Sequence, residues 1–202
     1  MNYNKIFRLD KKLIFVLGGS GYIGREIVKG LIALGGEVVV IDKHKTDLPE
    51  SVKFCSINLE KSNSYKKNID SCFKKFGTPN IFINTSYPKS KDWKFSKSDN
   101  LKYNSLQKNV KIHLNSYLWI TNIIAMQMKK KRIKGSIINL SSMYGIISQD
   151  PQIYKRTNKS ENVIYSAIKG GINTFSKQLA VIYGTHNIRI NTICPGGVIN
   201  EK

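Results

Sequence analysis

Short apolar runs alternate with longer segments of helical periodicity along the whole chain. The runs are only as long as a strand, which is typical of strands buried on both faces. They lie at residues 13–17, 38–41, 52–57, 81–83, 136–140 and 188–193. Apolar residues at helical spacing predict helices at residues 22–34, 108–131 and 163–183, and a lysine-rich segment predicts another at 62–76. Because parallel strands need crossover connections, this alternation predicts an α/β fold with six strands in a doubly wound parallel sheet.

Two polar, interrupted stretches do not fit the alternation. They span residues 86–104 and 146–162. Long connections of this kind usually run over the surface and often carry binding residues. We therefore predict surface loops near the ligand.

The length of the chain sets the number of domains. A chain of 202 residues with 41% hydrophobic composition can bury one substantial core, so residues 1–202 are predicted to form a single domain. No apolar run is long enough to cross a bilayer, and the charged first residues lack the apolar core of a signal peptide, which predicts a soluble, cytoplasmic protein. The cysteines, Cys55, Cys72 and Cys194, are widely spaced and odd in number, so we expect neither a disulfide framework nor a zinc site.

The formal net charge of +20 is large enough to attract nucleic acid, an anionic membrane or phosphorylated metabolites. The basic residues are spread along the chain, and the run at residues 129–132 falls where a helix should end. Cations there complement the helix dipole, so this run is either a solvated helix end or an anion-binding patch. Aromatic residues are not interleaved with the basic ones in a stacking pattern, and no recognition-helix signature occurs. The charge alone therefore does not favour a nucleic-acid partner.

A glycine-rich turn connects the first predicted strand to the first predicted helix. Its sequence, Gly19-Ser20-Gly21-Tyr22-Ile23-Gly24, matches the Gly-x-Gly-x-x-Gly fingerprint of dinucleotide-binding Rossmann folds. The glycines permit a tight turn, approach of the backbone to a pyrophosphate, and close packing of helix on strand. Asp42 ends the second strand, where a carboxylate would bind a ribose diol and repel a 2′-phosphate, which favours NAD over NADP. Arg25 and Lys43 leave NADP possible, and a plain turn followed by a capping aspartate is the simpler alternative.

Tyr165 and Lys169 are four residues apart at the start of the last predicted helix, so they share one face. A free phenol titrates near ~10, and a neighbouring ammonium lowers this pKa towards the working range of a general acid and base. Such pairs also arise by chance on solvated helices, so the pair gains its meaning from the glycine turn upstream. Together the two motifs predict a proton-transfer site beside a bound dinucleotide.

Features in chain order resemble the short-chain dehydrogenase/reductase family over nearly the whole sequence. They are the glycine turn at residues 18–24, Asp42, Asn84, Asn139-Leu140-Ser141-Ser142, the Tyr165–Lys169 pair and Asn191-Thr192-Ile193-Cys194-Pro195-Gly196. The resemblance implies that Tyr165 is the general acid/base, that Lys169 lowers its pKa and binds the nicotinamide ribose, and that Ser142 hydrogen-bonds the reacting carbonyl or alcohol. Hydride would pass between nicotinamide and that carbon. Ser141 would then be a turn residue.

The motif and the resemblance together imply a set of cofactor-binding residues. They are Gly18, Ser20, Gly21, Tyr22, Ile23, Gly24, Asp42, Asn58, Asn84, Tyr165, Lys169, Pro195 and Gly196. Asn58 stands where the family usually has an aspartate near adenine, and its amide could still hydrogen-bond there. Asn84 could instead only stabilise a strand end, and Pro195-Gly196 could be only a turn. His44 and His186 have no partner pattern, so no metal site is expected.

The sequence departs from the family pattern around the expected site. Asn84-Thr85-Ser86-Tyr87 replaces the family's Asn-Asn-Ala-Gly, so the loop beside the cofactor is altered. His113 stands where the family has a catalytic asparagine that supports a water relay; it could replace that relay or be a core histidine. The segment between Ser142 and Tyr165 is longer than the family norm and is expected to shape the substrate pocket.

The end of the chain is a further departure. It stops at Lys202, soon after Pro195, whereas the family continues through a substrate-covering helical loop and a final strand. The resemblance therefore predicts that the C-terminal part of the family fold is missing, which leaves the sixth strand as a sheet edge. The chain would be either a fragment or a natural truncation.

The sequence thus favours an NAD(P)-dependent oxidoreductase acting on a secondary alcohol or ketone. Its motifs are similar to those of bacterial flagellin- and surface-sugar-modification dehydrogenases, which implies a sugar or nucleotide-sugar substrate. The alternative is a truncated cofactor-binding protein without catalytic turnover. The family usually dimerises through its two longest helices, here residues 108–131 and 163–183, so the expected partners are a small-molecule substrate and a second copy of the chain.

Overall fold

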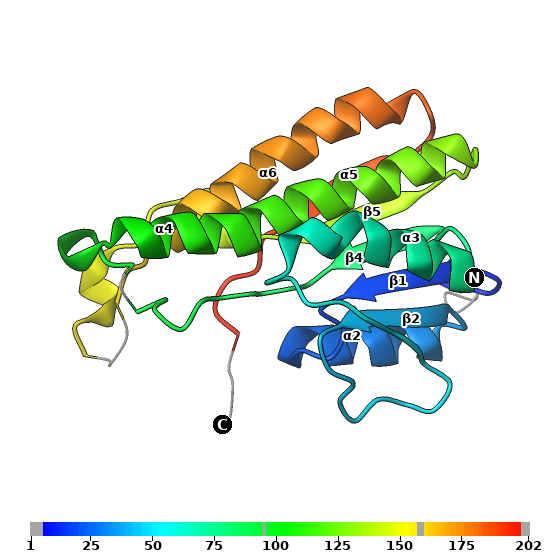
Figure 1. The fold of residues 1–202 in the computed structure, drawn as a ribbon, viewed down its shortest axis with the longest axis horizontal. Coiled ribbons are helices and arrows are strands. Elements are labelled where there is room, and N and C mark those ends of the chain that lie inside the picture. The colour runs from blue at the N-terminus through cyan, green and yellow to red at the C-terminus, as the bar shows by residue number, and fades with distance from the viewer. Residues whose placement is uncertain (1–5, 95, 157–159, 199–202) are drawn as a thin grey trace.

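The strands of the protein form a single parallel sheet (Figure 1). The structure, a computed structural model, describes residues 6–94, 96–156 and 160–198. Within these residues the sheet has six strands in the order β3-β2-β1-β4-β5-β6. The strands are β1 (Leu13–Leu17), β2 (Glu37–Asp42), β3 (Lys53–Ser56), β4 (Ile81–Asn84), β5 (Ser136–Leu140) and β6 (Arg189–Ile193). The predicted doubly wound sheet is confirmed.

The strand order reverses its direction at β1, and this reversal positions the site. At the carboxyl end of β1, Leu17 pairs with Ile41 of β2 on one side and with Asn84 of β4 on the other. The chain leaving β1 is therefore flanked by the ends of β2 and β4. In parallel α/β sheets, ligands bind in the crevice at such a switch point, beyond the carboxyl ends of the strands.

Helices cover both faces of the sheet. They are α2 (Tyr22–Ala33), α3 (Tyr65–Phe76), α4 (Tyr103–Asn109), α5 (Asn115–Lys130) and α6 (Val163–Gly184). Because side chains alternate along a strand, Ile14 and Val16 face α2, where they cluster with Val28. Phe15 and Leu17 face the opposite side, in the core cluster that α3, α5 and α6 cover.

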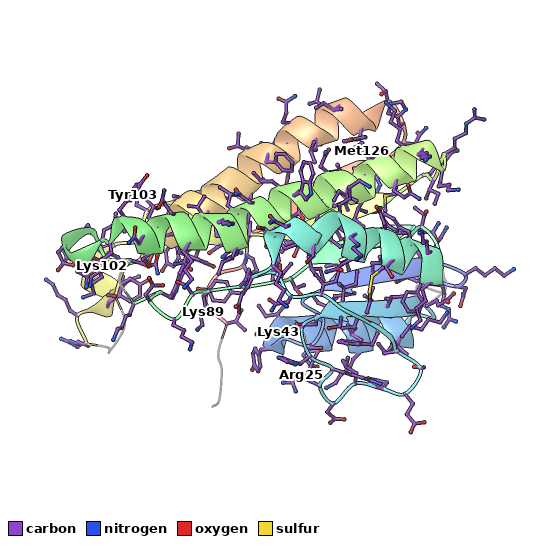
Figure 2. All side chains as sticks on the ribbon, viewed as in Figure 1. Arg25, Lys43, Lys89, Lys102, Tyr103 and Met126 are labelled. Atoms are coloured by element: carbon purple, nitrogen blue, oxygen red, sulfur yellow. A yellow bond between two sulfur atoms is a disulfide. The ribbon has the colours of Figure 1, made fainter. Side chains whose placement is uncertain are left out.

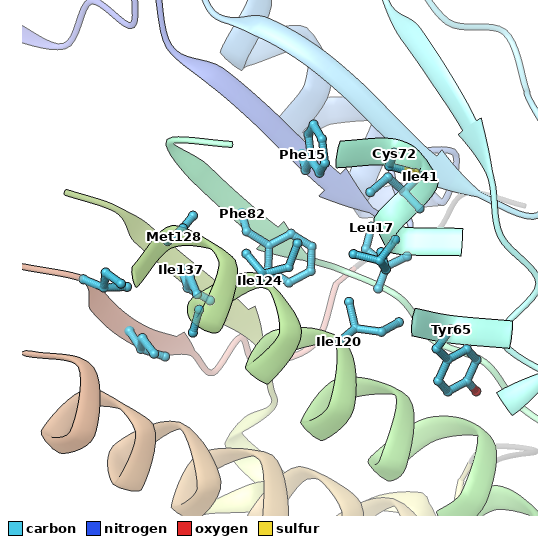
Figure 3. Close-up of a cluster of buried hydrophobic side chains, with 14 of the residues drawn as sticks. Phe15, Leu17, Ile41, Tyr65, Cys72, Phe82, Ile120, Ile124, Met128 and Ile137 are labelled. Atoms are coloured by element: carbon cyan, nitrogen blue, oxygen red, sulfur yellow. The ribbon is translucent and has the colours of Figure 1, made fainter. Parts of the chain in front are cut away.

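The larger cluster forms the main core of the fold (Figure 3). Phe15, Phe82, Ile120 and Ile124 in it are completely buried. Each such side chain contributes roughly 1.5–3 kcal/mol through burial. This core fixes α5 and α6 against the sheet and so holds their first turns beside its carboxyl edge.

The helix predicted at residues 108–131 is longer and less regular than its apolar pattern indicated. It begins at Tyr103 as α4, passes through a π-helical segment, η3 (Val110–Leu114), and continues as α5. The end of the loop predicted at residues 86–104 is therefore helical. The prediction missed this because α4 buries Ser105 and Asn109, which make polar contacts, and polar residues do not contribute to a hydrophobic pattern. π-Helical segments within α-helices often occur at functional sites.

Cys55 and Cys72 form a disulfide between β3 and α3, with their Cα atoms 6.4 Å apart. The expectation of no disulfide is therefore wrong. The expectation rested on the wide spacing of the cysteines along the chain. That spacing carries no information on how α3 packs over the sheet face on which Cys55 lies. Cys194 is a free thiol.

The surface is strongly basic, and its ion pairs are exposed. Lys66 and Asp70 on α3, for example, form an exposed pair of the kind that contributes little to stability. Lys129 and Lys130 lie in the last turn of α5, as expected of cations that complement a helix end. In the part of the chain that the structure describes, no helix combines the length and the apolar character needed to span a membrane.

Candidate active site

The glycine turn between β1 and α2 lies at the carboxyl edge of the sheet. Gly18 has a φ of +79°, and a Cβ there would lie 2.6 Å from the backbone nitrogen of Ser86. A Cβ on Gly24 would lie 2.2 Å from the carbonyl oxygen of Gly18. Only glycine fits at these two positions, because the first turn of α2 packs directly on the turn and on the chain that leaves β4. The start of α2 therefore opens into the crevice.

The carboxylate of Asp42 closes one side of this crevice. It accepts hydrogen bonds from the backbone nitrogen of Ser20, at 3.1 Å, and from its neighbour Lys43, at 2.7 Å. These bonds hold the carboxylate beside the glycine turn, at the end of β2. Ser20 does not line the cleft with its side chain, and its hydroxyl oxygen is buried without a partner.

Tyr117 of α5 joins the ends of β4 and β5. Its phenol oxygen lies 3.1 Å from the carbonyl oxygen of Asn84, 2.9 Å from that of Ser86 and 3.1 Å from that of Leu140. One hydroxyl donates to one of these acceptors at a time, and burial raises the pKa of Tyr117, so it stays a donor. This clamp explains why the chain after β4 runs so close to the chain after β5. A tyrosine on a buried helix face is the sole signal for this clamp in the sequence.

Asn84 lies beneath the cleft floor and does not line the cleft itself. Its side-chain oxygen accepts hydrogen bonds from the Ser86 hydroxyl, at 2.7 Å, and from the Ser86 backbone nitrogen, at 3.2 Å. The side chain is fully buried, and its amide nitrogen has no partner. An unpaired buried donor is costly, which makes this nitrogen a candidate contact for a ligand.

The two serines after β5 have different environments. The Ser141 hydroxyl donates a 3.1 Å hydrogen bond to the carbonyl oxygen of Lys169 and so ties β5 to α6. The Ser142 oxygen accepts one from the backbone nitrogen of Tyr144, at 3.2 Å, and Ser142 lines the same cleft as Tyr165. The structure therefore brings Ser142 and Tyr165 together, while Ser141 is engaged with backbone.

Tyr165 and Lys169 project from the first turns of α6 into the same cleft. Asn162 caps this helix by accepting a 2.8 Å hydrogen bond from the backbone nitrogen of Tyr165. The Nζ atom of Lys169 lies 5.6 Å from the centroid of the Tyr165 ring and donates a 2.9 Å hydrogen bond to the carbonyl oxygen of Leu140. The lysine is 3% exposed, so it reaches the cleft from below while the phenol stands at its surface.

The electrostatics of this pair differ from the prediction made from spacing. Burial raises the pKa of Tyr165, and the neighbouring hydroxyl of Ser142 lowers it in part. Burial also lowers the pKa of Lys169 to about 8. In this structure the ammonium is directed to the Leu140 carbonyl, so desolvation of the phenol outweighs any stabilisation of the phenolate by Lys169.

His113 lies in the π-helical segment and is completely buried. Neither ring nitrogen has a hydrogen-bond partner within the described residues. Burial and the neighbouring Lys169 lower the pKa of His113, so the ring is neutral. Its ring contacts Tyr87 at 5.3 Å and Tyr117 at 5.6 Å between centroids. The histidine therefore lies behind the cleft, in contact with a residue that lines it.

Tyr87 is the residue in the altered loop that sequence reasoning did not assign a role. Its ring meets Tyr165 edge-on, with the centroids 5.8 Å apart, and meets Trp93 in the same way at 6.0 Å. The Lys169 Nζ atom lies 6.0 Å from the same ring. Tyr87 thus forms one wall beside the phenol of Tyr165, and the presence of a tyrosine where the family has glycine was the signal for it.

One cleft of about 1100 Å³ joins these groups. Of the predicted cofactor-binding residues, it is lined by Gly18, Gly21, Tyr22, Ile23, Gly24, Asp42, Asn58, Tyr165, Lys169, Pro195 and Gly196. The side-chain oxygen of Asn58 accepts a hydrogen bond from the backbone nitrogen of Glu60, at 2.9 Å, which leaves its amide nitrogen for a ligand. The backbone of Pro195 is tied to the segment after β5 by a 3.1 Å bond from Met143. The cleft extends beyond Tyr165 to a second part lined by the two long loops, as predicted for ligand-proximal loops.

A doubly wound parallel sheet, a glycine turn at its switch point and a serine–tyrosine–lysine group at the same edge define a dinucleotide-binding fold with a proton-transfer site. Comparison with known proteins is more specific. Residues 12–201 match the family model described as short chain dehydrogenase. The chain therefore belongs to the short-chain dehydrogenase family and is an oxidoreductase, as its motifs predicted.

Individual relatives match over most of their length. The chain is 30% identical to the post-translational flagellin modification protein A of Campylobacter coli, over 96% of this chain and 80% of that protein. It is 29% identical to the NADH-dependent L-xylulose reductase of Ambrosiozyma monospora, over 96% of this chain and 75% of the other. A short chain dehydrogenase of Leptospira borgpetersenii, solved with bound NAD+, superposes with a TM-score of 0.85 at 24% identity, covering all of this chain and 76% of that one.

Proposed function

We propose that the chain transfers hydride between a nicotinamide dinucleotide and a secondary alcohol or ketone of a sugar-like substrate. The observation that carries the proposal is that Ser142, Tyr165 and Lys169 line the same cleft as the glycine turn, with the Lys169 Nζ atom 5.6 Å from the centroid of the Tyr165 ring. These groups can hold a carbonyl oxygen and exchange a proton with it. Relatives named as sugar reductases and as a flagellin modification protein support a sugar substrate.

The residues present fit a dinucleotide. The turn at Gly18 and Gly24 is too close to neighbouring backbone for any side chain, which leaves the amides of α2 open to a pyrophosphate. Within the residues that the structure describes, the amide nitrogen of Asn84, at the same edge of the sheet, is a donor without a hydrogen-bond partner. When bound, the nicotinamide supplies or accepts the hydride. The carboxylate of Asp42 would accept hydrogen bonds from a ribose diol and repel a 2′-phosphate, so we propose NAD rather than NADP.

The protein's own residues would handle the proton. In the direction of reduction, Ser142 donates a hydrogen bond to the carbonyl oxygen and Tyr165 donates its proton to the same oxygen. Lys169 holds positive charge beneath the phenol, which stabilises the phenolate that remains. We propose that His113 supports proton return from the side of Lys169, because its ring is neutral and contacts Tyr87 and Tyr117. A histidine that merely fills the core would leave turnover unchanged when replaced by a residue of similar size.

We also propose that two copies associate through α5 and α6, and that the protein works in the cytoplasm, where reduced nicotinamide cofactors are regenerated. Large apolar side chains are exposed on both helices: Trp119 is 52% exposed, Met126 55% and Val181 75% (Figure 2). Apolar residues gathered on neighbouring helices commonly mark an association surface. Light scattering at several concentrations would show a mass of two chains, and a monomer at all concentrations would contradict the association.

The function is tested on the purified 202-residue chain. NADH binding is followed by fluorescence titration, and turnover is followed at 340 nm with a panel of keto and hydroxy sugars. The proposal expects NADH binding and turnover of at least one sugar. NADH binding without turnover of any secondary alcohol or ketone would favour a cofactor-binding protein without catalysis, and absence of NADH binding would remove the basis of the proposal.

A further inference from the structure

The part of the cleft beyond Tyr165 is lined by lysines from one loop. Lys89, Lys94 and Lys97 all line the cleft, and all belong to the segment that joins β4 to α4. Figure 2 labels Lys89 on this segment. Lys91 belongs to the same segment and is exposed, but it does not line the cleft. The lysines of this loop therefore divide into three that face the cleft and one that does not.

Lys89 lies near the reacting group, separated from it by one aromatic ring. The Nζ atom of Lys89 is 5.9 Å from the centroid of the Tyr87 ring, and that ring is 5.8 Å from the ring of Tyr165. Trp93, between Lys89 and Lys94 in the sequence, packs edge-on against both tyrosines. A ligand that places its reacting carbon at Tyr165 thus has an aromatic wall beside it and ammonium groups at the outer end of that wall.

The opposite wall carries neutral hydrogen-bonding groups. Gln149 donates hydrogen bonds from its amide to the carbonyl oxygen of Asn162, at 3.0 Å, and to the hydroxyl of Ser166, at 2.8 Å. Tyr154 donates to the hydroxyl of Tyr144, at 3.0 Å. Phenol and amide groups of this kind suit a polyhydroxylated substrate, because they both donate and accept.

The charges in the cleft are separated along its length. Asp42 and Glu60 lie at the cofactor end, where Glu60 is 3.6 Å from the Nζ atom of Lys43. Beyond Tyr165, the lining includes one carboxylate, that of Glu161. Within the described residues, neither Lys89 nor Lys97 forms an ion pair. The outer part of the cleft therefore carries net positive charge facing the position of the substrate.

We propose that this outer part binds an anionic group of the substrate, a carboxylate or a phosphate, through Lys89, Lys94 and Lys97. The substrate class is thus an acidic or phosphorylated hydroxy sugar rather than a neutral polyol. This inference rests on the proposed function for the location of the reacting carbon at Tyr165. It goes beyond that function because it assigns a second recognition site to residues that take no part in proton or hydride transfer.

The experiment compares the parent with a triple variant, Lys89→Gln, Lys94→Gln and Lys97→Gln, and with the matched control Lys91→Gln. Substrates are supplied as pairs that differ in charge: sorbitol with sorbitol 6-phosphate, and glucose with glucuronate. Binding to the NADH complex is measured by Trp93 fluorescence in a Trp119→Phe background, and turnover is measured separately with NAD+, which accepts the hydride from these hydroxy compounds. Lysines can bind a phosphate or a carboxylate through the same charge-assisted hydrogen bonds. One pair therefore tests the phosphate, and the other tests the carboxylate.

The parent should bind at least one of the anionic compounds roughly tenfold more tightly than its neutral partner, because each charge-assisted hydrogen bond contributes about that factor. The triple variant should lose this preference, Lys91→Gln should keep it, and added salt should weaken it in the parent. Where turnover occurs, the loss should appear in KM for the anionic compound, with kcat and the neutral compound little changed.

Equal affinity for both members of each pair in the parent would overturn the inference. An equal loss of the preference for the anionic compound in the triple variant and in Lys91→Gln would also overturn the inference, since it indicates general attraction of anions by a basic protein. A matching loss of NADH affinity in the triple variant would assign the lysines to the cofactor instead. Selective anion binding without turnover of any sugar would leave the lysine site standing and would count against the proposed function alone.

Discussion

The Nζ atom of Lys169 lies 5.6 Å from the centroid of the Tyr165 ring and is held there by its hydrogen bond to the end of β5. Because the lysine is buried, its pKa falls to about 8. The protonation state of the group beneath the reactive phenol is therefore decided within the range of pH in which enzymes are commonly assayed.

This lowered pKa predicts a pH-dependent contribution to stability. Lys169 binds its proton less tightly in the folded chain, with a pKa of about 8, than in the unfolded chain, near 10.5. Between these values the unfolded state binds more protons, so stability rises with pH and the cost of burying the charged form is fully present only below pH 8. From pH 7 to pH 10, the free energy of unfolding of the parent should rise by roughly 2–3 kcal/mol relative to that of Lys169→Met, as measured by urea unfolding. A difference that does not change with pH would contradict the shift.

Two glycines of α2 make a matched test of the dinucleotide turn. A Cβ at Gly24 would meet backbone at 2.2 Å, whereas a Cβ at Gly30 meets nothing within 4 Å. Gly24→Ala should destabilise the fold by about 1–3 kcal/mol and abolish NADH binding, because the start of the helix must move. Gly30→Ala should leave binding intact and stabilise by roughly 0.5–1 kcal/mol. Thermal unfolding and NADH titration measure both effects, and similar NADH affinities for the two variants would count against the turn as the pyrophosphate site.

The proposed preference for NAD over NADP rests on Asp42. Replacement by serine removes the carboxylate that we propose faces the ribose, so NADH should bind roughly tenfold more weakly and discrimination against NADPH should fall by at least about that factor. Glu60→Gln is the control, since Glu60 lines the same end of the cleft and pairs with Lys43. Dissociation constants for both cofactors provide the measurement, and an unchanged NADH to NADPH ratio in Asp42→Ser would refute the assignment.

The disulfide between Cys55 and Cys72 closes a short loop across the core. Its reduction should lower the free energy of unfolding by roughly 3 kcal/mol, since a bridge over a loop of about this length restricts the unfolded chain by that amount. Unfolding with and without reductant measures the loss, with Cys194→Ser as a control that should respond to reductant like the parent. Alkylation of both Cys55 and Cys72 in unreduced, native protein would show that the bond does not form.

Much of the fold could be predicted from local pattern. The runs of β1, β2 and β4 are buried on both faces, so hydrophobic continuity alone marked them to within about a residue. The glycine turn was predictable because its residues are required by close packing with their neighbours along the chain. Tyr165 and Lys169 were predictable because their positions on one helix face follow from helical geometry.

Long-range contacts account for what local pattern did not predict. The π-helical segment at Val110–Leu114, which buries His113, packs against α6 and has no periodic signature. The phenol of Tyr117 reaches three carbonyls on two strands distant in sequence. The disulfide likewise joins residues brought together only by α3 packing over the sheet. The direction of the Tyr165 pKa shift depends on burial, which spacing alone does not reveal.

The central claim, that Tyr165 exchanges the proton with the substrate, is tested most directly by Tyr165→Phe on a sugar that the parent turns over. The variant keeps the ring that packs against Tyr87 and lacks only the hydroxyl. Its kcat should fall at least ~100-fold while its NADH dissociation constant stays within about twofold of the parent's. A variant that binds NADH and reduces the same sugar at the parental rate would contradict the account.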